Sequence, residues 1–167
     1  MLTEKEDDGF LIDLDLAVRL NANTASGAPS KTGTKVFMAI GALKGEHHNF
    51  MHDLESFFWV LFWICIHWDG PHRKRRIVTE FKDWNNKSIK ELAKLKIGLV
   101  LEDDFSKEMK VNFSEYCKPL IPCMQELWKE VFPGGKRWLS EDRELYFRVA
   151  DVLKRAREDF ADKLATL

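Results

Sequence analysis

The sequence of 167 residues predicts a mainly α-helical domain with a short β segment near its N-terminus. A continuous apolar run at residues 57–66 is typical of a buried helix. Later apolar residues recur at helical spacing, at residues 124–131 and again at 145–160. The length is that of one domain, so we expect residues 1–167 to form a single core.

Composition and charge exclude several classes of protein. Apolar residues make up 45% of the chain, which is too hydrophobic for an intrinsically disordered protein. Lys and Arg number 26 against 27 Asp and Glu, so no nucleic-acid partner is expected from overall charge. A membrane span needs about 20 apolar residues, more than the longest run here, so no membrane association is expected.

Cysteine usage and the N-terminus predict an intracellular protein, cytoplasmic or nuclear. Cys65, Cys117 and Cys123 show no CxxC spacing and are interpreted as reduced thiols that pack in the core. The first eight residues are acidic, whereas a secretory signal begins with basic residues.

The N-terminal part of the chain is expected to be non-helical. Residues 10–16 combine apolar residues with Asp13 and Asp15, a pattern that predicts a β segment. Residues 21–34 are rich in Asn, Thr, Ser, Gly and Lys and have no periodicity, so they predict a long loop. Loops of this length are usually functional or disordered.

A central helix is expected at about residues 53–67. Asp53, Glu55 and Ser56 offer acceptors suited to a first helical turn. Because the run that follows has no polar face, the helix should be covered on all sides and form the axis of the core. Residues from about 84 to 164 should supply helices around it, with a capping box at Ser88 and Glu91 and a last helix opening near Ser140.

The order of several short motifs carries more information than any one of them. They are Ile12-Asp13-x-x-Leu16-Ala17, a Ser/Thr-rich loop, Gly33-Thr34-x-x-Phe37-Met38-Ala39, and His52-Asp53-Leu54-Glu55-Ser56 leading into the apolar run. This order resembles the C-terminal lobe of a protein kinase and is most similar to the fungal-type protein kinases. The resemblance implies that residues from about 10 to 43 form the metal-binding motif and activation segment of a truncated kinase C-terminal lobe. The N-terminal lobe of such a kinase is not in this sequence.

The resemblance assigns roles to three residues. Asp13 would be the carboxylate that holds Mg²⁺ beside the phosphates of ATP, although Asp13 and Asp15 could also be solvated loop acids. Thr34 would position the substrate hydroxyl, or simply cap a turn. Asp53 would be a buried structural aspartate that accepts backbone amides of the catalytic loop, or an ordinary N-cap.

The resemblance also makes residues of the long loop candidates for regulation. Thr24, Ser26, Ser30 and Thr32 would lie in the activation segment, where added phosphate can order a chain that faces arginines. The simpler interpretation of each is an unmodified hydroxyl. Gly41 stands where the family usually has a glutamate that ties this segment to a later helix, so we expect a looser segment here.

The catalytic apparatus of a kinase is missing from this sequence. A glycine-rich loop, a strand lysine paired with a helix glutamate, and a His-Arg-Asp loop are required, and none is present. We therefore expect no retained catalytic residue and no productive binding of Mg²⁺ and ATP by this chain alone. The expected function is that of a fragment of a serine/threonine protein kinase, inactive by itself.

Truncation of the lobe should leave apolar surface and an Asp53 without its partners. Two other functions are compatible with the sequence. One is a non-catalytic, pseudokinase-like module that binds a partner protein through its exposed core helix and its loop. The other is an unrelated helical bundle. A zinc site at His47, His48, His52 and Asp53 is disfavoured because no cysteine joins them. The basic run at 73–76 is interpreted as a solvated loop.

Overall fold

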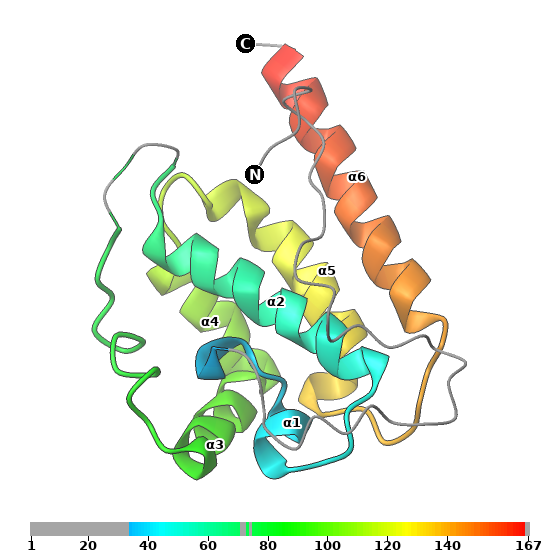
Figure 1. Cartoon of the computed structure of the whole chain (residues 1–167). Helices are drawn as coiled ribbons and strands as arrows, with labels where there is room; N and C mark the ends of the chain where they lie inside the picture. The colour runs from blue at the N-terminus through cyan, green and yellow to red at the C-terminus, as the bar shows by residue number, and fades with distance from the viewer. Residues whose placement is uncertain (1–33, 71–72, 74, 166–167) are drawn as a thin grey trace, which may run out of the picture. The chain divides into compact units, whose positions relative to one another are not determined.

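The computed structural model describes residues 34–165, apart from 71, 72 and 74. These residues belong to one compact unit, which extends from Gly33 to Leu167. Within the described ranges every regular element is a helix, as the sequence predicted for the body of the chain (Figure 1). The β segment expected at 10–16 lies outside the described residues.

Helix α2 (Phe50–His67) is the central element of this unit (Figure 1). It begins three residues earlier than predicted, because Asn49 caps it rather than Asp53. The Asn49 side chain accepts hydrogen bonds from the backbone N–H groups of Met51 (3.0 Å) and His52 (3.3 Å). In return, His52 Nδ1 accepts the Asn49 N–H at 3.1 Å, which completes a capping box.

Aromatic side chains pack one side of α2 into the core. Phe58 and Phe62 both lie against the ring of Phe105, with centroid distances of 5.4 and 5.5 Å. Trp59 and Phe58 also contact Phe132 beyond the end of α5. Aromatic side chains bury large areas, so this cluster contributes a major part of the apolar stabilisation.

Two apolar side chains on the opposite face of α2 are exposed. Phe57 is 62% exposed and Ile64 is 44% exposed, and Trp68 follows one turn further on. The prediction that this helix is covered on all sides is therefore wrong for this face. Phe57 and Ile64 are two turns apart on one side of α2, and Trp68 caps the C-terminal end of the helix.

Two short elements precede α2. The 3₁₀ turn η2 (Lys35–Phe37) leads into the five-residue helix α1 (Ile40–Lys44). Gly45 ends α1 with a φ of 86°, in the left-handed region that glycine adopts without strain. Helix α1 packs mainly against α3 and also contacts α2.

The remaining helices surround α2. They are α3 (Ile89–Leu99), α4 (Glu102–Asn112), η3 (Lys118–Leu120), α5 (Ile121–Val131), η4 (Pro133–Gly135) and α6 (Leu145–Ala165). The capping box predicted at the start of α3 is confirmed, since Ser88 Oγ accepts the Glu91 N–H and Glu91 accepts the Ser88 N–H. Helix α6 begins at residue 145 rather than near Ser140, because the Asp142 carboxylate accepts the Glu144 N–H just before it.

Helix α6 lies along α5 (Figure 1). Leu145, Val149 and Val152 on its inner face are buried in the core. None of the helices in the described part of the chain is both long and apolar enough to cross a membrane.

Candidate functional site

The structure describes two of the residues to which the resemblance assigned roles, Thr34 and Asp53. Asp13, Thr24, Ser26, Ser30 and Thr32 lie outside the described residues. Their roles as metal ligand and as phosphorylation sites stay predictions.

Thr34 is exposed at the start of η2. Its backbone carbonyl accepts the Phe37 N–H at 2.9 Å, and its hydroxyl makes no capping hydrogen bond. The interpretation of Thr34 as a turn-capping side chain is therefore wrong. Its role in positioning a substrate hydroxyl stays a prediction.

Asp53 is exposed, contrary to the expectation that it is buried. Its position in the first turn of α2 directs the carboxylate outward, where it accepts a hydrogen bond of 2.9 Å from His48 Nε2. This hydrogen bond raises the pKa of His48. Asp53 is neither the N-cap, which is Asn49, nor without a partner, and its role beside a catalytic loop stays a prediction.

The buried carboxylate in this region is Glu55, two positions further on. It is fully buried, and its Oε1 accepts both the Ile40 N–H at 2.6 Å and the Trp59 Nε1–H at 3.0 Å. Burial raises the pKa of Glu55, and the two donors oppose that rise. Glu55 thus fixes the start of α1 on α2.

Lys96 of α3 holds the same segment from the other side. Its side chain is fully buried, and Nζ donates a hydrogen bond of 2.7 Å to the carbonyl oxygen of Met38. The ammonium group also lies 4.2 Å from the centroid of the Trp59 ring, a cation–π contact. Burial lowers the pKa of Lys96, and the negative charge of Glu55 opposes that effect.

A second polar cluster surrounds Gly41. A Cβ at this position would collide with Nε2 of His52 and lie 2.5 Å from Glu46 Oε2 and 2.6 Å from Arg137 Nη2. The Arg137 guanidinium donates to both Glu46 oxygens, at 2.7 and 2.5 Å. Glycine is therefore required at position 41 by these neighbouring side chains rather than by backbone conformation.

The pair of Glu46 and Arg137 corrects the expectation that the segment around Gly41 is loose. Gly41 cannot supply a carboxylate, but Glu46 supplies one five positions later and binds an arginine beyond α5. The hydrogen bond from Arg137 lowers the pKa of Glu46, so the carboxylate is ionised at neutral pH. The segment is tied down by a different residue from the one the resemblance implied.

His52 completes this cluster. Its Nδ1 accepts the Asn49 N–H, so the neutral ring carries its proton on Nε2, which faces Glu46 Oε2 at 3.8 Å without a hydrogen-bond partner. The ring packs edge-on against Trp138 at 5.2 Å. Burial lowers the pKa of His52. No group of three or more His, Cys, Asp or Glu side chains in the described ranges is arranged to hold a metal ion.

The segment that Glu55, Lys96 and Arg137 hold in place contains the Phe37-Met38-Ala39 motif on which the resemblance rests. Comparison with known protein families tests that resemblance directly. Residues 1–65 match the family model for fungal protein kinases. The match confirms the resemblance over these residues, which we call the fungal-kinase segment. No curated protein and no solved structure matches the chain.

The fungal-kinase segment ends inside α2. The residues that hold stretch 38–46 in place come partly from this segment and partly from later in the chain. Glu55 and Glu46 lie within the segment, whereas Lys96 and Arg137 lie beyond it. The sequence predicted Glu55 only as an acceptor in the first helical turn, and it gave no role to Lys96 or Arg137. In the structure Glu55 accepts the Ile40 and Trp59 N–H groups instead. A carboxylate just before a wholly apolar run was the one signal that could have identified Glu55.

The described polar groups form a structural anchor rather than a reaction centre. Glu55, Lys96 and Arg137 each bind the backbone or a side chain of residues 38–46. Their chemical effect is to fix the conformation of that stretch against α2 and α3.

Proposed function

We propose that this chain is the C-terminal-lobe part of a fungal-type serine/threonine protein kinase. The match of residues 1–65 to the family model carries the proposal. The buried contacts of Glu55 and Lys96 support it, because they would hold the end of an activation segment in a fixed position. The protein would be intracellular, in keeping with three buried, unbridged cysteines.

Within this proposal, two residues of the fungal-kinase segment would act on substrate and metal. Asp13 would provide a hard oxygen ligand for Mg²⁺, and the ion would neutralise charge on the phosphates of ATP. Thr34, exposed beside η2, would hold the hydroxyl of a protein substrate. Phosphorylation of Thr24, Ser26, Ser30 or Thr32 would order the preceding loop.

The polypeptide by itself should not transfer phosphate. Its sequence contains no His-Arg-Asp loop, no strand lysine with a helix glutamate and no glycine-rich phosphate loop. Asp13 alone could not position ATP, because phosphoryl transfer depends on simultaneous positioning of nucleotide, metal and acceptor.

An assay with radiolabelled ATP and a generic acceptor protein tests this part of the proposal. We expect no transfer above background from the wild-type chain, and none from Asp13→Asn or the matched control Asp15→Asn. Transfer that Asp13→Asn abolishes and Asp15→Asn preserves would contradict it.

The second candidate function is a pseudokinase-like module that binds another protein. Exposed apolar side chains on α2, Phe57 and Ile64, and at its C-terminal end, Trp68, favour it. Sequencing the 5′ end of the transcript separates the two functions. An upstream reading frame with His-Arg-Asp and a strand lysine supports the kinase, whereas a transcript that starts at Met1 supports the binding module.

A further inference from the structure

A groove of about 690 Å³ lies between α3, α4 and the turn-rich stretch 80–87. Its lining includes Phe81 and Trp84 from that stretch and Leu95, Gly98 and Leu99 from α3. Phe81, Trp84 and Leu99 belong to the core, whereas Leu95 is 42% exposed. The floor of the groove is therefore apolar, and Leu95 is the part of it most exposed to solvent.

Gly98 leaves part of this groove open. It is the next-to-last residue of α3, and glycine in a helix costs up to about 1 kcal/mol relative to alanine. A Cβ at position 98 would meet no atom within 4 Å, so packing does not require glycine there. The absence of a side chain leaves space in which an apolar group from another molecule can lie against the floor.

The rim of the groove is mainly acidic. It carries four carboxylates and two ammonium groups, from Glu80, Glu91, Asp104, Glu108, Lys87 and Lys94. Glu91 is used by the α3 capping box, and Glu108 accepts a hydrogen bond from Asn112. Among the described residues, no ion pair engages Glu80 or Asp104. Their charge is available to a cationic partner.

We propose that this groove binds a peptide segment of another protein in which an apolar side chain is flanked by Lys or Arg. The apolar side chain would occupy the space above Gly98, and the flanking cations would pair with Glu80 and Asp104. Opposite charges on the two partners favour such a segment and disfavour an acidic one. This binding goes beyond the proposed kinase function and does not depend on Asp13 or Thr34.

The groove nevertheless borders the fungal-kinase segment. Lys35 Nζ donates a hydrogen bond of 3.0 Å to the backbone carbonyl of Lys87, a residue of the rim. A peptide held here would therefore lie next to η2 and the exposed Thr34.

The test measures binding of a fluorescent leucine–lysine peptide, amphipathic and as long as α3, to the whole chain. We compare wild type with Gly98→Trp, which fills the groove, and Gly98→Ala, which leaves most of it open. Gly98→Trp should weaken binding about tenfold or more, the effect of losing one central contact. Gly98→Ala should bind as wild type does, and a leucine–glutamate peptide of the same length should not bind.

A second variant keeps the test decisive if Gly98→Trp does not fold. Glu80→Lys combined with Asp104→Lys changes only exposed rim residues, and it should also weaken binding about tenfold. The proposal is overturned if wild type fails to bind the lysine peptide at about millimolar concentration. It is equally overturned if both the folded Gly98→Trp and the rim variant bind like wild type, or if the glutamate peptide binds as well.

Discussion

Gly41 and Gly98 both lie within helices but have opposite surroundings. A methyl group at position 41 would collide with the buried ring of His52, whereas one at position 98 meets open space. We predict that Gly41→Ala lowers the free energy of unfolding by about 1–3 kcal/mol. Gly98→Ala should raise it by up to about 1 kcal/mol. Urea unfolding measures both, and equal changes of the same sign would show that the cluster around Gly41 is not formed.

His52 should make the fold less stable in acid. Burial lowers its pKa below the ordinary value near 6.5, so the unfolded chain binds the proton more tightly. The free energy of unfolding should therefore fall as the pH drops from about 7.5 to about 5.5. His67, whose pKa burial also lowers, adds to this fall, and His48, whose pKa Asp53 raises, opposes it.

The variant His52→Gln isolates the contribution of this residue. Glutamine at the third helical position can still accept the Asn49 N–H, so the capping box is kept while the titration is removed. We predict that the acid-induced loss of stability is smaller than in wild type by up to about 1 kcal/mol. An unchanged pH dependence in urea unfolding would show that His52 titrates as it does in an unfolded chain.

At the residue scale, local pairs could be predicted and distant ones could not. Ser88 and Glu91 are three positions apart, and their capping box is a known sequence pattern. Glu46 and Arg137 are 91 positions apart, and Lys96 and Met38 are 58 apart, so only the tertiary fold brings them together. The exposure of Asp53 was missed because the motif defines its position on α2 but not what covers that turn.

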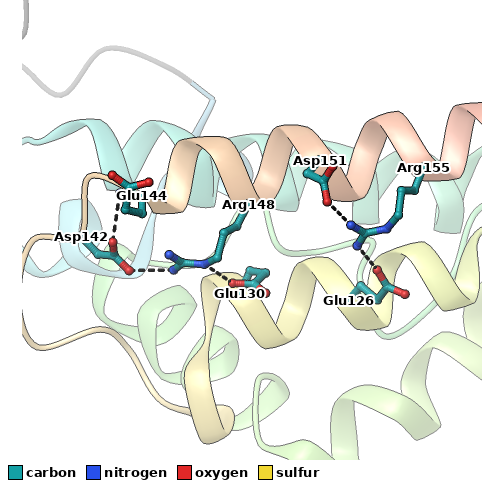
Figure 2. A network of polar contacts seen from close by, with 7 residues as sticks. All are labelled: Glu126, Glu130, Asp142, Glu144, Arg148, Asp151 and Arg155. Carbon is teal, nitrogen blue, oxygen red and sulfur yellow. Dashed lines mark hydrogen bonds and ion pairs between the residues drawn. The ribbon is translucent and has the colours of Figure 1, made fainter.

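At the scale of elements, two kinds of contact join α6 to α5. Arg148 and Arg155 of α6 bind Glu130 and Glu126 of α5, as Figure 2 shows. The same two arginines also bind Asp142, just before α6, and Asp151 on α6 itself. These groups are substantially exposed, and exposed ion pairs contribute about 0–1 kcal/mol each. The buried inner face of α6 should therefore contribute more.

A pair of substitutions on α6 compares the two contributions. Val152→Ala removes buried methyl groups and should lower the free energy of unfolding by about 1–3 kcal/mol. Arg155→Ala breaks two exposed ion pairs and should cost less than about 1 kcal/mol, and still less at high salt. If urea unfolding shows that Arg155→Ala lowers the free energy of unfolding more than Val152→Ala does, the ion pairs are the main contact between these helices.

Helices with strong apolar patterns were predicted better than their ends. The run at 57–66 predicts α2, but its start depends on the reciprocal bonds of Asn49 and His52, and histidine is not a usual capping-box partner. Similarly, Asp142 rather than Ser140 provides the acceptor before α6. Several side chains that can accept a hydrogen bond precede both α2 and α6, and packing decides which of them caps the helix.

At the scale of the whole described unit, the fungal-kinase segment depends on residues outside it. The family match ends at residue 65, yet Lys96 and Arg137 hold stretch 38–46 in place. The sequence predicted a mainly helical unit around one apolar helix, and that prediction is confirmed. Truncation of a kinase-like lobe predicts exposed apolar surface, but which side of α2 is exposed depends on the number and placement of the neighbouring helices.

The central claim is that residues 38–40 are fixed to α2 and α3 by the buried side chains of Glu55 and Lys96. Hydrogen exchange of the Ile40 amide, which donates to Glu55, tests it most directly. We predict that this amide exchanges only when the whole unit unfolds, with a free energy within about 1 kcal/mol of the slowest α2 amides. Rapid exchange of Ile40 while the α2 amides stay protected would contradict the claim.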